Sequence, residues 1–327
     1  MMSFLQTKPK LTMLLNCLQP REVASVTGHT GPVDLVRFHP SEANTLCTSA
    51  FDSSIRIWDV RGSGASQRSR IDLQARVGPG AAISVEWGSV NMLVVAERDN
   101  KVHLYDIRKL NPSFGANGGR ASSAAPVHTF DLQKNEVTGC KMSPNGEFLI
   151  ATTFRGEGMG ELRIWPWKEG LDNPPIPEDV MTFPGHTAPI HRFMLSPDGT
   201  HLASGGSDTI VGLWDVASMV CTNTILRGTK LVRSVGFSHD STLLASSSSD
   251  DEGVDIANAD TGTLIGNVKI GKRVGAEDVA FHPKYNWLAC ARTEVQGMVE
   301  IGGAFPSAPP PPPHGPVVVA KLNLINA

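Results

Sequence analysis

Three residue types that can form a hydrolytic site recur in this sequence at fixed spacing. His186, Ser204 and Asp208 supply an imidazole, a hydroxyl and a carboxylate, the groups that a serine hydrolase uses as base, nucleophile and orienting acid. A second set precedes it, in which Thr48 stands four residues before Asp52 as Ser204 stands four before Asp208. If either set were catalytic, its hydroxyl would attack a carbonyl carbon while the imidazole took the proton.

A tryptophan completes each set, six residues after the aspartate. Because an indole N–H only donates hydrogen bonds, four such side chains can form a buried chain in place of an active site. An active site is normally built once, and neither set has a nucleophile elbow or an oxyanion-hole motif. We therefore expect no catalytic residue and two structural tetrads: His29, Thr48, Asp52 and Trp58, and His186, Ser204, Asp208 and Trp214.

The tryptophans belong to a longer repeat. Trp58, Tyr105, Trp165, Trp214 and Ile256 follow one another at intervals of 47, 60, 49 and 42 residues. The long interval holds a Gly/Ser/Ala-rich insertion at 110–126, and without it the spacing approaches the roughly 40 to 45 residues of a four-stranded propeller blade. Each repeat has an alternating strand that ends in a turn, a more apolar strand, and a strand that carries the aromatic residue. The pattern predicts an all-β propeller with six recognisable blades.

Other repeats change the tetrad. Asp99 stands six residues before Tyr105, so tyrosine replaces tryptophan, and Asp250 stands six before Ile256, where the aromatic ring is lost. In the third repeat Met159 occupies the aspartate position within FRGEGMGE, residues 154–161. That glycine-rich turn lacks the Gly-Lys-Ser/Thr ending of a phosphate-binding loop, so we expect no nucleotide site.

Composition narrows the class of protein. The 327 residues are 40% hydrophobic and 19% charged with a net charge of -3, which is typical of a globular chain without bulk attraction to nucleic acid. The five cysteines have no CxxC spacing, so neither a disulfide framework nor a zinc site is indicated. No run approaches the roughly 18 apolar residues of a membrane span. We expect no cofactor, no metal, no membrane and no small-molecule substrate, and a reducing, intracellular location.

The Gly-His and Trp-Asp pairs at 28–29 and 58–59 resemble the WD-repeat propellers. More narrowly, residues 28–61, 232–268 and 278–291 are similar to the THO complex subunit 3 proteins, which also have a blade with isoleucine in place of tryptophan and a closing His-Pro-Lys turn. The resemblance implies a nuclear, non-catalytic scaffold of the transcription-export assembly, with other THO/TREX subunits as partners and RNA reached through the complex. It also implies seven blades.

The seventh blade is the expected point of departure. Residues 1–20 show no strand-turn-strand order, so we expect 1–22 to be a segment of uncertain order. We expect 23–327 to be the propeller, with a truncated first blade and insertions near 110–126 and 292–316. The last insertion contains five prolines, Pro309 to Pro313. It is either a tolerated loop or an extended segment that docks on SH3-like or profilin-like grooves.

Two other functions stay open. Trp58, Asp59, Val60 and Arg61 match the short WDxR pattern of substrate receptors for cullin-RING ubiquitin ligases. Asp59 and Arg61 would then contact the ligase adaptor. A propeller enzyme would instead need carboxylates or histidines that converge in a central channel, which periodicity alone does not place.

Overall fold

The fold is built from short antiparallel strands. The computed structural model describes residues 3–8, 11–16, 22–61, 66–72, 82–88, 90–110, 125–132, 135–154, 158–167, 180–227, 230–248, 253–270, 275–292 and 317–321. Within these ranges the one helical element is a single 3-10 turn, η1 (Ile107–Lys109), and every other regular element is a strand. The expected all-β class is confirmed.

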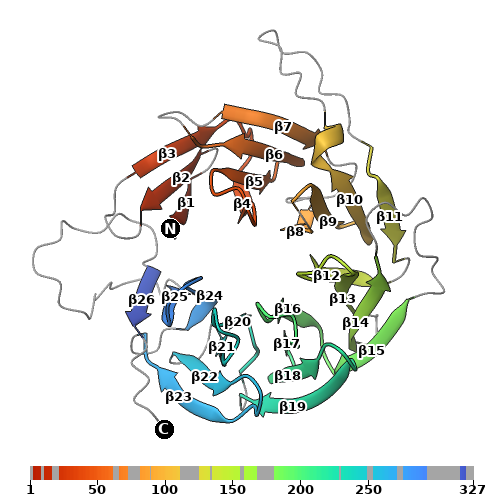
Figure 1. The fold of residues 1–327 in the computed structure, drawn as a ribbon, viewed down its shortest axis with the longest axis vertical. Coiled ribbons are helices and arrows are strands. Elements are labelled where there is room, and N and C mark those ends of the chain that lie inside the picture. The colour runs from red at the N-terminus through yellow and green to blue at the C-terminus, as the bar shows by residue number, and fades with distance from the viewer. Residues whose placement is uncertain are drawn as a thin grey trace, which may run out of the picture. The chain divides into compact units, whose positions relative to one another are not determined.

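The chain forms two compact units, residues 1–156 with 162–182 and residues 157–161 with 183–327. The first unit contains the sheets β1-β2-β3, β4-β5-β6-β7 and β8-β9-β10-β11, and the second contains β16-β17-β18-β19, β20-β21-β22-β23 and β24-β25-β26 (Figure 1). The sheet β12-β13-β14-β15 contributes residues to both. In every sheet each strand pairs with its sequence neighbour, as a meander requires.

The strand bounds follow the repeats found in the sequence. They are β1 (Ser3–Lys8), β2 (Leu11–Asn16), β3 (Glu22–Thr27), β4 (Val33–Phe38), β5 (Thr45–Ala50), β6 (Ser54–Asp59), β7 (Ser66–Asp72), β8 (Ala82–Trp87), β9 (Met92–Glu97), β10 (Lys101–Asp106), β11 (His128–Asp131), β12 (Glu136–Met142), β13 (Phe148–Phe154), β14 (Gly160–Pro166), β15 (Met181–His186), β16 (Ile190–Leu195), β17 (His201–Gly206), β18 (Ile210–Asp215), β19 (Val220–Leu226), β20 (Ser234–Phe237), β21 (Leu243–Ser247), β22 (Val254–Asn258), β23 (Leu264–Val268), β24 (Ala276–Phe281), β25 (Trp287–Arg292) and β26 (Val317–Lys321).

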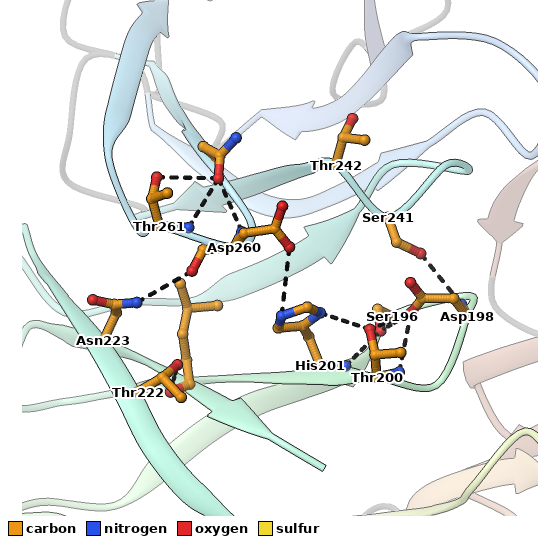
Figure 2. Close-up of polar contacts among 12 residues, drawn as sticks. Ser196, Asp198, Thr200, His201, Thr222, Asn223, Ser241, Thr242, Asp260 and Thr261 are labelled. Atoms are coloured by element: carbon orange, nitrogen blue, oxygen red, sulfur yellow. Dashed lines mark hydrogen bonds and ion pairs between the residues drawn. The ribbon is translucent and has the colours of Figure 1, made fainter. Parts of the chain in front are cut away.

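Side-chain hydrogen bonds hold the turns between the first two strands of a sheet. Between β16 and β17 the Ser196 hydroxyl donates to Asp198 Oδ1 at 2.6 Å, and Asp198 Oδ1 accepts the Thr200 amide at 3.0 Å (Figure 2). Gly199 takes the left-handed conformation that the turn needs, with φ of 74°. Ser238, Asp240 and Thr242 repeat the arrangement between β20 and β21. The turn residues therefore have a defined bonding role.

Aromatic residues of the third strands fill the space between sheets in the first unit. Tyr105 on β10 packs against Ile55, Ile57 and Ile71 of the sheet β4–β7. Trp165 packs against Phe130, with ring centroids 5.3 Å apart. Trp58 instead covers Leu46 and Phe38 of its own sheet. The aromatic position of the third strand is thus buried in these repeats, but the residues around it differ from one repeat to the next.

The expectation that residues 1–20 lack strand-turn-strand order is wrong. β1 and β2 pair antiparallel from Ser3–Asn16 to Lys8–Leu11, and β3 continues the sheet. The sheet also crosses the expected boundary at residue 22. Pro9 and Lys10 stand between these two six-residue strands, and the proline was the local signal for a break between strands that sequence reasoning did not use.

Several expectations fall on residues outside the described ranges: most of the insertions at 110–126 and 292–316, the prolines at 309–313, Asp250 and Cys17. Among the described cysteines, Cys47, Cys140 and Cys290 are buried free thiols. Burial raises the pKa of each to about 12, so they are inert packing groups. In the part of the chain that the structure describes, no helix is long and apolar enough to cross a membrane.

Candidate functional site

The four residues of the first set meet in one chain of hydrogen bonds. His29, in the loop before β4, places Nδ1 at 3.0 Å from Asp52 Oδ2 and Nε2 at 2.6 Å from the Thr48 hydroxyl. Trp58 donates its indole N–H to the same hydroxyl at 2.8 Å. The chain joins the loop, strand β5, the turn after it and strand β6.

The second set has the same geometry in the second unit. His186 places Nδ1 at 2.9 Å from Asp208 Oδ1 and Nε2 at 2.8 Å from the Ser204 hydroxyl. Trp214 donates to that hydroxyl at 2.9 Å. Threonine and serine therefore supply an equivalent hydroxyl in the two repeats.

Each chain admits one consistent direction of donation. The indole can only donate to the hydroxyl oxygen, so the hydroxyl proton is available for Nε2 of the histidine. The histidine then carries its proton on Nδ1 and donates it to the aspartate. Hydroxyl, imidazole and carboxylate stand in the order of a hydrolytic triad, with an indole added at the nucleophile.

Burial decides against catalysis at both hydroxyls. Ser204 is 0% exposed and Thr48 is 1% exposed, so a substrate carbonyl has no access to either oxygen. The indole N–H also engages one of the two lone pairs of each hydroxyl oxygen. These chains lack the reachable nucleophile that acyl transfer requires. Their hydrogen bonds connect the segment that contains the histidine to two strands of the following sheet and to the turn between them.

Close packing requires the glycine before each histidine. A Cβ on Gly185 would lie 2.4 Å from Cζ2 of Trp214, so a larger residue would displace the indole ring. A Cβ on Gly28 would lie 2.4 Å from NH1 of Arg56 and 3.2 Å from Cη2 of Trp58. The tryptophan is thus the main neighbour of the glycine in the second set, and Arg56 is the nearest one in the first.

The Asp52 carboxylate accepts hydrogen bonds from several donors. Besides His29, it accepts the Thr30 amide at 2.9 Å and the Ser54 hydroxyl at 2.7 Å. Burial by itself raises the pKa of the Asp52 carboxyl, but the hydrogen bonds from His29, Ser54 and Thr30 outweigh it and hold that pKa well below its usual range. Asp52 is therefore ionised throughout the neutral range.

Sequence reasoning missed a third polar chain, in the sheet β20–β23. Arg227 donates to the Ser246 hydroxyl at 2.9 Å and pairs with Asp255 at 2.8 Å. It stands 19 residues before Ser246, as His29 stands 19 before Thr48, so a guanidinium takes the place of the imidazole. The equal spacing was the signal, but a search for histidine does not find an arginine.

The second repeat has no such chain among its described residues. Glu97, Asp99 and His103 place ligand-type atoms within 4.8 Å of one another. The Lys101 ammonium lies 2.9 Å from Asp99 and already supplies a positive charge. His103 Nδ1 lies 2.8 Å from the Thr129 hydroxyl, and burial lowers the pKa of His103. The cluster is an internal charge network.

Asp59 and Arg61 form an exposed clamp. Arg61 donates Nε at 2.9 Å and NH2 at 2.7 Å to Asp59 Oδ2, and its side chain is 65% exposed. An open pocket of about 250 Å³ lies beside it, lined by Glu42, Ala43, Asn44, Thr45 and Arg61.

The neighbouring sheet repeats the clamp, because Arg108 donates to Asp106 at 2.9 and 2.8 Å and its side chain is 58% exposed. Sequence reasoning had singled out the first arginine alone.

Comparison with known proteins agrees with this geometry. The family model for the WD domain, G-beta repeat, matches residues 20–59, 177–215 and 219–253, and these ranges contain both tetrads. The chain carries WD40 repeats. Its sheets are those of a WD-repeat β-propeller, and the expected fold class is confirmed: six repeats recognised in the sequence, with a three-stranded sheet β1-β2-β3 before them.

Three relatives indicate the breadth of the similarity. THO complex subunit 3 of Arabidopsis thaliana is 28% identical over 81% of this chain and 73% of its own length. WD repeat-containing protein AAC3 of Dictyostelium discoideum is 24% identical over 67% of this chain and 41% of its own length. E3 ubiquitin-protein ligase COP1 of Arabidopsis thaliana is 27% identical over 52% of this chain. The WD-repeat chain spans less than half of the last two relatives, with 21% of COP1 covered.

Proposed function

We propose that this WD-repeat chain is a non-catalytic scaffold subunit of a THO/TREX-like complex, which couples transcription to mRNA processing and nuclear export. Its partners are the other subunits of that complex, its location is the nucleus, and it reaches RNA through the complex. The proposal is carried by one observation: the similarity to THO complex subunit 3 extends over 267 residues and includes most of both chains.

The described sites support a scaffold. The hydroxyls of both tetrads are buried, so the residues that look most like a hydrolytic site serve the architecture. The tetrads instead hold each Gly-His pair to the strands that follow it, and rigid sheets with exposed turns suit binding of other proteins. We propose the tetrads as structural residues on that basis.

Affinity purification from nuclei tests the proposal. The tagged chain is expected to recover other THO subunits, and mass spectrometry of the eluate identifies them. A matched preparation carries Asp208→Ala, which we expect to weaken the fold and reduce recovery in proportion to the folded fraction. An eluate of the parent chain without THO subunits would contradict the proposal.

One observation favours a second function, a substrate receptor of a cullin-RING ubiquitin ligase. The exposed Asp59–Arg61 clamp has a counterpart at Asp106–Arg108 in the neighbouring sheet. Each aspartate fixes its arginine in a bidentate geometry, so the outer face of the guanidinium is held ready for a carboxylate or an aromatic ring.

Arginine substitution separates the two functions. Arg61→Ala together with Arg108→Ala is expected to abolish co-purification of the ligase adaptor if the second function holds, while THO subunits are retained if the first one holds. Arg192→Ala, in an exposed ion pair elsewhere, serves as control. Retention of the adaptor by the double variant would count against the receptor function.

A further inference from the structure

The outer strand β19 (Val220–Leu226) has an unusual sequence for a sheet edge. It is the last strand of its sheet and its partner in that sheet is β18. Its seven residues, VCTNTIL, contain neither a charge nor a proline. Exposed edges are normally protected by such residues, because the free N–H and C=O groups of an edge strand can pair with another chain.

Outer strands of other repeats carry that protection. β7 (SQRSRID) has two arginines and an aspartate, β11 (HTFD) ends in an aspartate, and β15 (MTFPGH) contains a proline. β23 (LIGNV) is also uncharged but is only five residues long. β19 is thus the longest of the described outer strands to lack both devices.

The exposed side chains of β19 are partly apolar. Leu226 is 73% exposed and Val220 is 57% exposed, the two highest values among the exposed large hydrophobic residues of the described chain. Thr222 and Thr224 between them are also exposed, whereas Ile225 on the other face is buried. The more exposed side chains therefore alternate with less exposed ones along β19, although its register with β18 shifts at Thr222, which has no direct partner on that strand.

Two side-chain hydrogen bonds anchor β19 to neighbouring elements. The Asn223 amide donates to the Asp260 carbonyl at 3.2 Å on the turn that follows β22 (Figure 2). The Thr222 hydroxyl donates to the Leu213 carbonyl on β18 at 3.3 Å. The edge is consequently a preformed template, and pairing with it does not require ordering β19 first.

The sequence of β19 is self-complementary about its centre. In an antiparallel pair of two copies centred on Asn223, Val220 lies opposite Leu226 and Thr222 opposite Thr224. Every residue then meets one of similar character on the same face, without a charge on either strand. Apolar and Thr–Thr cross-strand pairs are favourable, and a two-fold interface requires such a self-complementary patch.

We propose that β19 is a dimerisation edge, and that its occupant is β19 of a second copy of this chain. The two four-stranded sheets then join into one continuous antiparallel sheet, in which the exposed row of Val220, Thr222, Thr224 and Leu226 lies beside the equivalent row of the other copy. A single strand pair is smaller than a standard interface of about 1,600 Å². The dimer is therefore expected to be weak, with its population set by the protein concentration.

Charges introduced on the exposed row of β19 test the proposal. In the variant Thr222→Lys with Thr224→Lys, each lysine faces a lysine of the other copy, and the dimer dissociation constant should rise at least about tenfold. The variant Thr222→Glu with Thr224→Glu should be impaired equally. A mixture of the two variants should form a heterodimer, because each lysine then faces a glutamate. Sedimentation equilibrium over a wide range of concentration measures all three.

Val90→Lys with Val127→Lys is the matched control, since both valines are exposed residues of the first unit and the added charge is the same. It should dimerise like the parent. Melting temperatures establish that every variant is folded, and Thr224→Lys alone repeats the test if a double variant is not.

A cross-link checks the register. In a Cys221→Ser background, Asn223→Cys places two thiols directly opposite, with Cα atoms about 4.5 to 5.5 Å apart, within the range that a disulfide spans. Val220→Cys in the same background faces Leu226 and should not form one. The proposal is overturned by a parent that stays monomeric, by dimers that persist in both same-charge variants, by a mixture that fails to associate, or by cross-linking at 220 in place of 223.

Discussion

At the scale of single residues, one hydroxyl decides how the tetrads are interpreted. Ser204 has a triad-like imidazole and carboxylate, yet it is 0% exposed and accepts an indole N–H. The same atoms that would promote attack on a substrate therefore form a closed internal network. Removing any member leaves its neighbours buried without partners, so substitutions here should act on stability.

Asp208→Ala tests this directly. The change leaves the buried His186 Nδ1 without its acceptor, at a cost of about 1 to 3 kcal/mol for a buried donor left unsatisfied, and it also removes the acceptor of the exposed Thr187 amide. We expect a lower melting temperature and more binding of a hydrophobic dye. Asp260→Ala, whose carboxylate is 68% exposed, is the control, and equal melting of the Asp208 variant and the parent would contradict the structural role.

Asp52 should give the fold a specific dependence on acid. Because the pKa of Asp52 is lower in the folded chain than its usual value near 3.9, ionised Asp52 stabilises the fold at neutral pH. That contribution is lost as the pH falls below the usual value toward the folded one. We expect Asp52→Asn to be less stable at neutral pH and to lose less stability on acidification. Melting temperatures measured between neutral and strongly acidic pH check this, and parallel curves for variant and parent would refute it.

At the scale of elements, His29 and Arg227 join a loop to the strands of the sheet that follows it, whereas His186 is the last residue of β15 and links that strand to β17 and β18 of the next sheet. In the sheet β20–β23 an arginine makes the equivalent connection. Arg227 has a fully buried side chain, and its carboxylate partner Asp255 is 19% exposed. The guanidinium reaches Ser246 and Asp255 together, so it replaces both the imidazole and the turn aspartate.

Replacing one partner of the Arg227–Asp255 pair should lower the free energy of unfolding more than replacing both partners. Arg227→Met leaves the Asp255 carboxylate without its cation, and disrupting a buried pair from one side typically costs about 3 to 5 kcal/mol. Asp255→Leu alone is expected to be similarly harmful, whereas the double variant should recover part of the loss. A double-mutant cycle from denaturant unfolding measures the coupling, and strictly additive effects would mean that the pair is not coupled.

At the scale of the whole molecule, the net charge affects how strongly the chain can bind RNA. A chain with a formal charge of -3 gains little from displacing counterions on a polynucleotide. We therefore expect the purified chain to bind single-stranded RNA weakly and with little sequence preference at physiological salt. Fluorescence anisotropy of a labelled oligonucleotide measures this, with the assembled complex as the positive comparison. Tight binding by the isolated chain would contradict an indirect role in RNA recognition.

Residue types and their spacing were enough to predict the repeat, the order of strands within each recognised repeat, and the members of both tetrads. Each tetrad is encoded at fixed spacing, as in Thr48, Asp52 and Trp58, because a meander places residues of neighbouring strands at register positions that the turn lengths set. Turn residues such as Asp198 and Gly199 likewise act within a few positions of themselves. Local rules of this kind can be followed along the chain without knowledge of what lies beside it.

Tertiary structure decided what depends on neighbours far apart in the sequence. Only packing showed that Ser204 is inaccessible, that Arg227 reaches Asp255, and that Gly185 lies against the Trp214 ring. It also showed that β1 and β2 pair, and that β19 keeps an uncharged edge exposed. Burial and pairing are properties of surfaces brought together by folding, so residue type and spacing alone do not fix them.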